Sequence, residues 1–87
     1  MYLVKVYVTL KPTVNDPQGL TVLGGLKNLG FGVIDEVRVG KYLEVRVNET
    51  DRSKTELVVT EMCQKLLCNP VIEEFRFELH DLAVESI

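Results

Sequence analysis

The feature that most constrains the fold is a run of alternating apolar and polar residues that continues on both sides of Gly40. Val37 and Val39 alternate with a charged residue before the glycine, and apolar residues alternate with charged ones again in residues 42–47. Period-two alternation is typical of a strand with one buried face, and glycine supplies the positive φ that a tight turn needs. The run therefore predicts a β-hairpin with strands over residues 33–39 and 42–47.

Two further strands and two helices flank this predicted hairpin. Apolar residues alternate through residues 2–11, and Pro12 ends that strand because it has no N–H for a ladder. The last strand is predicted over residues 71–79, where apolar residues alternate with charged ones. The first helix follows Asp16, and the second covers residues 52–67, each with apolar residues at helical spacing.

The first helix carries clear start and stop signals. Asp16 is a strong N-cap residue, and Pro17 occupies the first helical position, where its missing N–H costs nothing. Gly30 fits the left-handed position just past the end of the first helix. Gly24 and Gly25 interrupt the middle of that helix, at about 1 kcal/mol each relative to alanine. We interpret them as the place where the helix approaches the sheet closely.

The element order β-α-β-β-α-β indicates an α+β, ferredoxin-like sandwich. We expect a four-stranded antiparallel sheet in spatial order 4-1-3-2, with both helices on one face, in a single domain over residues 1–87. Residues 80–87 form a C-terminal tail in this scheme. The opposite face stays open, and the alternation places these residues on it: Lys5, Tyr7, Glu36, Arg38, Tyr42, Glu44, Arg46, Glu74, Arg76 and Glu78.

Two interpretations of the open face follow from its charges. Its four basic and four acidic residues can pair across strands on a solvated surface, each pair stabilising by roughly 0.2–1 kcal/mol. Alternatively, Tyr7 and Tyr42 add enough apolar area for the face to bind a protein partner or a second copy. An RNA-binding sheet of this topology would need more stacking aromatics in a basic surround.

Composition excludes several classes of protein. Hydrophobic residues make up 46% and charged residues 26% of the chain, which are ordinary values for a folded domain. No apolar run approaches the roughly 20 residues of a membrane span. The net charge of −3 disfavours a general nucleic-acid binder, which would present a basic surface. We therefore expect a cytoplasmic protein that binds neither membranes nor nucleic acids.

No arrangement of residues is typical of a catalytic or metal site. Ser53 and Ser86 lie in contexts that do not suggest activation, and Gly40 and Lys41 are not part of a phosphate-binding loop. With His80 as the single histidine, a zinc site would need ligands from another chain. We expect no catalytic, cofactor-binding or metal-binding residues, and a chain that is not an enzyme on its own.

The two cysteines, Cys63 and Cys68, lie in the second predicted helix. In an α-helix, five residues place two side chains about 140° apart around the axis. We therefore expect the thiols to be unable to bridge, and to serve as small core or boundary residues in a reducing compartment.

Several segments, in this order and spacing, resemble the PurS family, the small subunit of phosphoribosylformylglycinamidine synthase. The resemblance runs over about residues 2–79. Its most specific part is the combination of the Asp-Pro-Gln-Gly motif with the Val-Arg-Val-Gly-Lys motif that follows it. The matching segments are residues 4–12, Asp16-Pro17-Gln18-Gly19, Val37-Arg38-Val39-Gly40-Lys41-Tyr42, residues 62–67 and residues 69–73.

The resemblance implies a non-catalytic subunit of an ATP- and glutamine-dependent complex in purine biosynthesis. A glutaminase subunit would release ammonia, and a large synthetase subunit, expected to hold ATP and magnesium, would convert formylglycinamide ribonucleotide to formylglycinamidine ribonucleotide. This chain would bridge the two and assist ammonia transfer as a homodimer or homotetramer. The residues expected to contact partners, or to shape those contacts, are Asp16, Gln18, Arg38, Lys41 and Tyr42.

A second hypothesis from a different class is a small-molecule-sensing regulatory module of the same topology. Such a module would hold its ligand at a dimer interface near a glycine-rich loop. Residues 30–32, with the sequence Gly-Phe-Gly, are the candidate loop.

Overall fold

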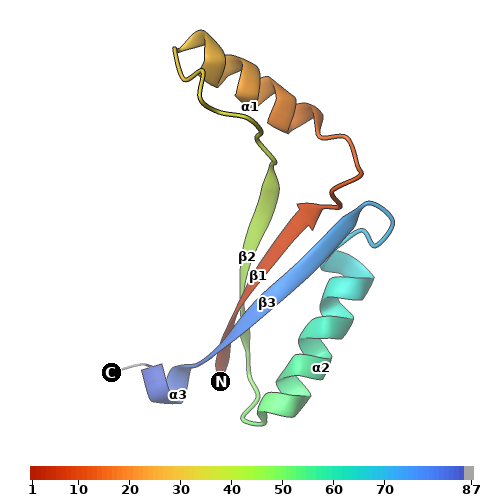
Figure 1. Cartoon of the computed structure of the whole chain (residues 1–87). Helices are drawn as coiled ribbons and strands as arrows, with labels where there is room; N and C mark the ends of the chain where they lie inside the picture. The colour runs from red at the N-terminus through yellow and green to blue at the C-terminus, as the bar shows by residue number, and fades with distance from the viewer. Residues whose placement is uncertain (86–87) are drawn as a thin grey trace.

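The computed structural model of the chain describes residues 1–85 and is built on a three-stranded antiparallel sheet (Figure 1). Strand β1 (Tyr2–Leu10) lies in the centre, between β2 (Gly40–Val47) and β3 (Glu73–Asp81). Tyr2 is the register partner of both Val47 and Asp81. The sheet therefore joins the beginning, the middle and the last part of the described chain.

The core is centred on β1. Val4, Val6 and Val8 point to the same face and are almost fully buried, as the alternation predicts. Helix α2 (Arg52–Met62) covers this face with Val59 and Thr55, both completely buried. The helix-facing residues of the two outer strands are only partly buried, so α2 alone leaves the flanks of the sheet incompletely covered.

Helix α2 begins where the sequence predicts, with the Asp51 side chain accepting a bond from the Lys54 backbone N–H. Its continuation, η1 (Cys63–Leu67), is a π-helical turn in which the Cys68 N–H donates to the Cys63 carbonyl over 2.9 Å. The 140° separation expected for the two cysteines assumed an α-helix throughout. That assumption is wrong, because a π-helical turn rotates by a smaller angle per residue about the helix axis. Both thiols are buried and unbridged, and burial raises the pKa of each thiol.

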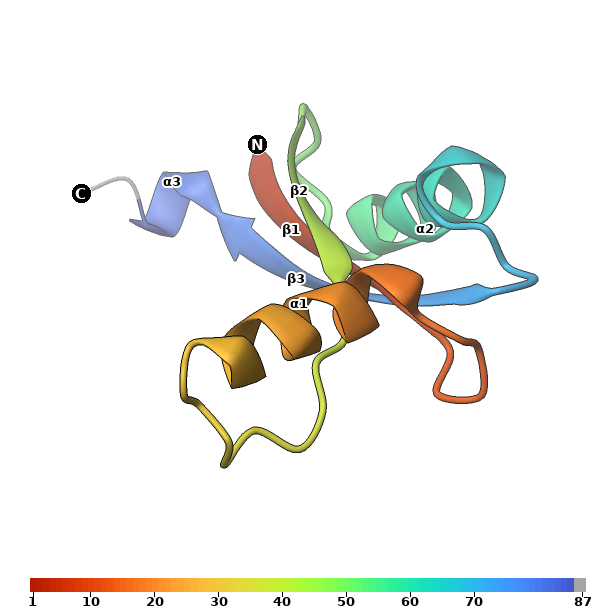
Figure 2. The same ribbon diagram turned by 90° about the horizontal axis from the view of Figure 1, so that it is seen from above.

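Helix α1 (Pro17–Asn28) projects away from the sheet, at the opposite end of the molecule from most of α2 (Figures 1 and 2). A Cβ atom added to Gly24 or Gly25 would meet nothing within 4 Å. The interpretation of these glycines as a close approach of the helix to the sheet is therefore wrong for the single chain. The two-helix layer is wrong for the single chain too, because α2 is the main cover of the sheet.

The predicted hairpin does not form within the chain. Among residues 1–85, Gly30 alone has a positive φ, 97°, so Gly40 does not adopt the turn conformation. Gly40 is instead the first residue of β2, opposite Thr9, and residues 33–39 are not part of the sheet. The predicted four-stranded sheet is therefore a three-stranded one, because the chain passes straight through Gly40.

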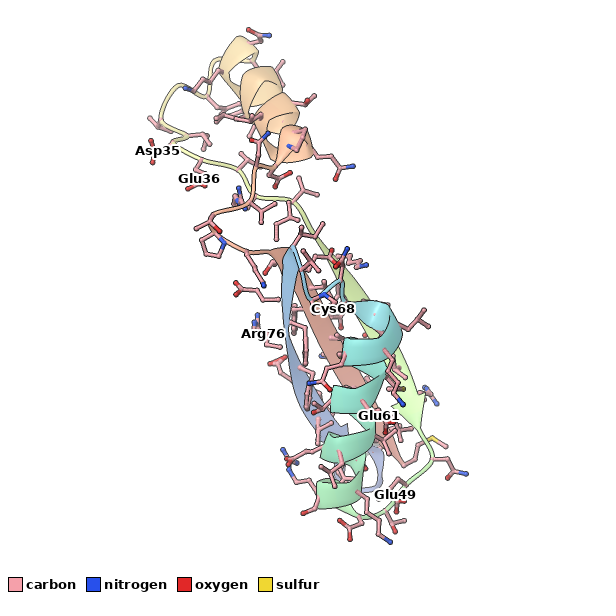
Figure 3. The ribbon with its side chains drawn as sticks, turned by 90° about the vertical axis from the view of Figure 1, so that its right-hand side faces the viewer. Asp35, Glu36, Glu49, Glu61, Cys68 and Arg76 are labelled. Carbon is pink, nitrogen blue, oxygen red and sulfur yellow. The ribbon has the colours of Figure 1, made fainter. Side chains whose placement is uncertain are left out.

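The projecting helix makes the molecule long and thin. Its radius of gyration is 16.7 Å and its principal extents are 49 × 34 × 14 Å, whereas a compact domain of this length has a radius of about 12 Å. Figure 3 shows Asp35 and Glu36 on the segment beyond the sheet, on the same side as α1. Residues 80 and 81 of the predicted tail extend β3, and α3 (Leu82–Glu85) follows, while residues 86–87 lie outside the described part.

Candidate partner-contact site

The Asp16 carboxylate joins the start of α1 to the segment before β2. One oxygen, Oδ1, accepts a hydrogen bond from the Gly19 N–H over 2.9 Å, as an N-cap does. The other, Oδ2, accepts from the Val39 N–H over 2.7 Å. Because Asp16 is only 4% exposed, these bonds replace water as partners of a buried charge.

Gly19 allows the two segments to come together. A Cβ at this position would lie 2.2 Å from the Val37 carbonyl oxygen and 2.8 Å from Asp16 Oδ2. No side chain fits there without moving backbone. The glycine of the Asp-Pro-Gln-Gly motif is therefore required by packing between residues 16–19 and 37–39.

Arg38 also joins the segment before β2 to the loop that precedes α1, through two hydrogen bonds. Its Nη2 atom donates to the Lys11 carbonyl over 3.0 Å and to the Val14 carbonyl over 2.9 Å. These carbonyls belong to the loop between β1 and α1, so the side chain holds that loop against the segment before β2. Together, Asp16, Gly19 and Arg38 form a junction that keeps residues 37–39 in line with β2.

The hydrogen bonds at the junction lower the pKa of Asp16, first through the Val39 N–H and then through the Gly19 N–H. A carboxylate with a lowered pKa stabilises the fold above its unfolded pKa of about 4, and this contribution is lost as the pH falls through the lower, folded value. We expect Asp16→Asn to be less stable than the native chain at pH 7, and the difference to shrink below about pH 4. Urea unfolding from pH 2 to pH 7 measures it, and a pH-independent difference would contradict the linkage.

Three of the five predicted contact residues, Asp16, Gln18 and Lys41, line one cavity of about 200 Å³ beside this junction. Lys41 Nζ lies 4.0 Å from Glu73 Oε2 in a half-exposed ion pair. The complete lining consists of Val8, Leu10, Asp16, Gln18, Val39, Gly40, Lys41 and Glu73. The residues that line this cavity include no serine, cysteine or histidine.

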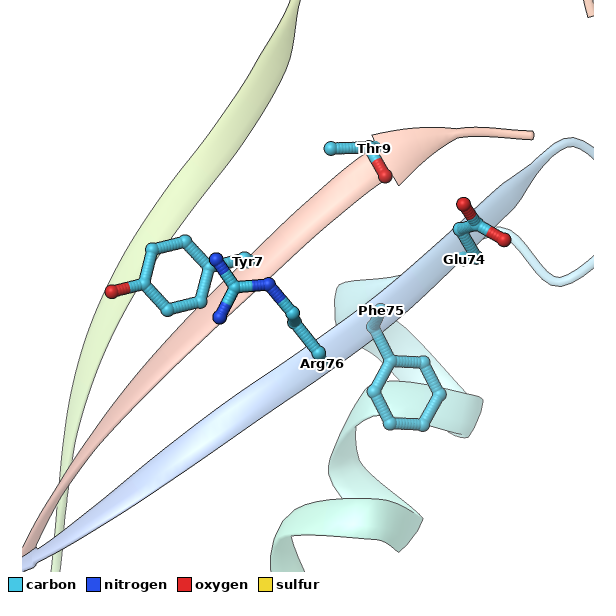
Figure 4. A pocket seen from close by; sticks show the side chains of 5 residues that line it. All are labelled: Tyr7, Thr9, Glu74, Phe75 and Arg76. Carbon is cyan, nitrogen blue, oxygen red and sulfur yellow. The ribbon is translucent and has the colours of Figure 1, made fainter. Parts of the chain in front are cut away.

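Tyr42 belongs to a different surface, the open face of the sheet. Its ring lies 5.1 Å from that of Tyr7, and the Arg76 guanidinium stacks over Tyr7 at 3.9 Å (Figure 4). The Tyr7 hydroxyl donates to Glu78, and the Tyr42 hydroxyl donates to Glu44. Burial, followed by the Glu44 hydrogen bond, raises the pKa of Tyr42 to about 12.

This aromatic cluster borders a second cavity, of about 290 Å³, which is lined by Tyr7, Thr9, Glu74, Phe75 and Arg76 (Figure 4). Tyrosine and arginine are enriched at the energetically important positions of protein interfaces. A tyrosine pair held by an arginine and two carboxylates presents such side chains in fixed positions. The open face is thus the second candidate contact surface of the chain.

The structure therefore divides the predicted residues into two groups. Asp16, Gln18 and Lys41 meet at the junction cavity, Arg38 turns to the loop carbonyls beside it, and Tyr42 lies on the open face. Sequence reasoning did not single out Gly19 as a packing residue, although it belongs to the Asp-Pro-Gln-Gly motif that carries the resemblance. Residues 30–32 of the alternative hypothesis form an exposed turn beyond α1, so the ligand role of that turn stays a prediction.

The part of the chain that the structure describes was searched for a metal site and for a membrane-spanning helix. Within residues 1–85, no three histidine, cysteine, aspartate or glutamate side chains gather closely enough to hold a metal ion. No helix in the same part of the chain has the length and apolar character needed to cross a membrane.

Comparisons with known proteins agree on one family. The family model for PurS, phosphoribosylformylglycinamidine (FGAM) synthase, matches residues 3–81. The chain is 44% identical over 85 residues to the PurS subunit of that synthase from Bacillus subtilis, covering 98% of this chain and 100% of the relative. It is also similar to the B. subtilis PurS crystal structure, with a TM-score of 0.85, 46% identity, and coverage of 93% of this chain and 100% of that chain.

A further solved structure places this fold in an assembly. A chain in the structure of PurLQS from Thermotoga maritima matches with a TM-score of 0.81 and 26% identity, covering 92% of this chain and 99% of that chain. The matches span both motifs of the junction, the Asp-Pro-Gln-Gly segment and the Val-Arg-Val-Gly-Lys segment. The chain therefore belongs to the PurS family of phosphoribosylformylglycinamidine synthase subunits.

Proposed function

We propose that this chain is the non-catalytic subunit that bridges the glutaminase and synthetase subunits of FGAM synthase in purine biosynthesis. The observation that carries the proposal is its match, over nearly its whole length, to PurS subunits, including a chain of the PurLQS structure. The two candidate surfaces support it, because both consist of side chains suited to protein contact and neither has a reactive constellation.

In this role, the chain assists the transfer of ammonia from the glutaminase to the synthetase in the cytoplasm. The synthetase would hold ATP and magnesium, and it would use the ammonia to convert formylglycinamide ribonucleotide to formylglycinamidine ribonucleotide. The chain itself would hold no cofactor. Its contribution is to set the distance and orientation of the two partners, which turns the passage of ammonia into an intramolecular step.

We propose that the partner contacts are made directly by the exposed residues Gln18, Lys41 and Tyr42. Asp16 and Arg38 act through the junction, because their hydrogen bonds fix the segment that carries the exposed residues. Tyr42 is the strongest of these contacts, since it lies within the tyrosine and arginine cluster of the open face.

We also propose that the chain self-associates into a homodimer or homotetramer. Large apolar side chains of α1 and the turn after it are exposed, including Leu20, Val22, Leu29 and Phe31. Helix α2 exposes Leu57, and the π turn exposes Leu66. An exposed apolar surface of this extent on a small chain marks a site of association.

A reconstituted synthase tests the bridging role. Purified glutaminase and synthetase subunits from the same source should turn over slowly with glutamine until this chain is added, whereas ammonium-driven turnover should hardly change. Tyr42→Ala should raise the concentration of chain that gives half-maximal stimulation, with Ser53→Ala at an exposed position of α2 as the control. If the chain changed neither rate, or both equally, the bridging role would be wrong.

A further inference from the structure

We propose that Cys63 and Cys68 form a reversible disulfide within one chain, made by a hydroperoxide and opened by a thiol reductant such as glutathione. The π-helical turn η1, which begins at Cys63, builds this modification site. The α-helical spacing assumed from the sequence excluded such a disulfide, and the π turn removes that obstacle. The inference goes beyond the proposed function and does not depend on it.

The hydrogen bond that closes the π turn limits how far apart the two cysteines can lie. The Cys68 N–H donates to the Cys63 carbonyl, and the distance from nitrogen to oxygen is 2.9 Å. In standard backbone geometry, a Cα atom lies about 2.4 Å from the oxygen and about 1.5 Å from the nitrogen of its own residue. Joined end to end, these distances set an upper limit of about 6.8 Å between the two Cα atoms. The true distance is shorter, because the atoms do not lie on one line.

This upper limit matches what a disulfide requires. The Cα atoms of bridged cysteines are usually about 4.4–6.8 Å apart. In an unbroken α-helix, five residues rise about 7.5 Å along the axis alone, which places their Cα atoms beyond that range. The extra residue that a π turn accommodates is therefore what brings the two cysteines within reach of each other.

The two side chains also face the same part of the core. Cys63 is completely buried and Cys68 is 6% exposed, and both belong to the buried cluster that contains the valines of β1. Figure 3 shows Cys68 where the helical segment ends, beside the sheet. Burial raises the pKa of the Cys63 thiol, and the nearby Cys68 raises it further, as expected for neighbouring thiols. Side chains directed into one cluster meet the second condition for a disulfide, which is that their Cβ atoms do not point apart.

Cys68 is the thiol that an oxidant reaches first. It precedes an exposed turn over residues 69–71, which the Lys11 ammonium holds by donating to the Pro70 carbonyl over 2.8 Å. Exposed turns of this kind open at a lower free energy than a sheet unfolds. Because burial raises the pKa of both thiols, the reaction proceeds through such a local opening, in which a thiolate forms more readily.

The reaction moves two electrons from the sulfur atoms to the hydroperoxide. When the Cys68 thiolate attacks hydrogen peroxide, an S–O bond forms, the O–O bond breaks, and the departing hydroxide takes the thiol proton to become water. The Cys63 thiolate then attacks the sulfur of the resulting sulfenic acid. The S–S bond forms, and the second hydroxide leaves as water with the proton of the second thiol. Two thiols and one peroxide thus give one disulfide and two waters.

Mass spectrometry of the full, folded chain tests the site. The chain is treated with a small excess of hydrogen peroxide, the peroxide is removed, and the chain is unfolded in the presence of iodoacetamide. We expect a product that is monomeric on a non-reducing gel and lighter than the reduced chain by two hydrogen atoms. It should take up iodoacetamide only after treatment with dithiothreitol. Cys68→Ala is the matched control, and its Cys63 should stay available for alkylation.

Glutathione buffers measure whether the fold itself favours the disulfide. Since burial slows the exchange, equilibrium is approached from the reduced chain and from a disulfide-bonded chain that is made in concentrated urea and then refolded. We expect the equilibrium constant for disulfide formation to be at least about tenfold larger in the folded chain than in urea. By linkage, the disulfide should raise the folding constant of the chain by the same factor.

A monomeric disulfide that the folded chain favours over the unfolded one supports the site. Thiols that stay free after peroxide treatment, a product linked to a second copy, or a sulfinic acid or glutathione adduct at Cys68 without a disulfide would each overturn it. An equilibrium constant no larger in the folded chain than in urea would also overturn it, because the fold would then not hold the thiols within bonding range. These measurements do not involve synthase activity, so their failure would leave the proposed function untouched.

Discussion

Replacing Gly19 with alanine is expected to destabilise the fold by about 2–3 kcal/mol, as other overpacking substitutions do. The added Cβ would lie 2.2 Å from the Val37 carbonyl oxygen and 2.8 Å from Asp16 Oδ2. Either α1 or residues 37–39 must move, and each movement separates the Val39 N–H from Asp16. The loss therefore exceeds the gain of up to 1 kcal/mol that alanine brings to a helix.

A second glycine of the same helix provides the control. Gly24→Ala meets nothing within 4 Å, so we expect it to be neutral or to stabilise by up to about 1 kcal/mol. Urea unfolding of both variants, with unchanged m-values, measures the difference in the free energy of unfolding. Equal stability of the two variants would show that the junction does not need close packing at Gly19.

Truncating Val6 to alanine is expected to cost roughly 2–3 kcal/mol, since the cavity left in a tightly packed core adds to the lost burial. Val6 is completely buried on the central strand, where it faces the layer formed by α2. A small domain has only about 5–15 kcal/mol of stability in total. The substitution should therefore remove a large fraction of it and lower the midpoint of thermal unfolding by several degrees.

Thr9→Val on the same strand is the matched control, because Thr9 is exposed and valine keeps the branched side chain that suits a strand. Its free energy of unfolding should change by no more than about 0.5 kcal/mol. If Val6→Ala were as mild as this control, the core would lie elsewhere than between β1 and α2.

Local signals in the sequence predicted local structure well. Asp16 caps the helix that it was expected to cap, because a capping bond depends on residues within one turn. The alternation in residues 2–11 correctly placed Val4, Val6 and Val8 in the core, because alternate residues of a strand face the same side. The PurS resemblance, carried by two short motifs, is confirmed by the family match.

The pairing of strands could not be predicted from the same signals. Alternation around Gly40 shows that two strand-like segments meet there, and it is equally compatible with a turn or with a continuous strand. The outcome depends on groups that are distant from Gly40 in sequence. The Asp16 carboxylate accepts a bond from the Val39 N–H, and the Lys11 and Val14 carbonyls accept bonds from the Arg38 side chain. The contact residues stay a prediction, and the structure gives two of them, Asp16 and Arg38, hydrogen bonds within the junction.

The central place of β1 has a consequence for synthesis on the ribosome. Tyr2 pairs with Asp81, so the first strand made must wait for the last one before its second edge is covered. At about 5–20 residues per second, this interval lasts roughly 4–16 s. During that time the valine face of β1 has at most β2 and α2 to cover it. A nascent chain of this kind offers chaperones an apolar strand for several seconds, and its final sheet forms only after residues 73–81 have left the exit tunnel.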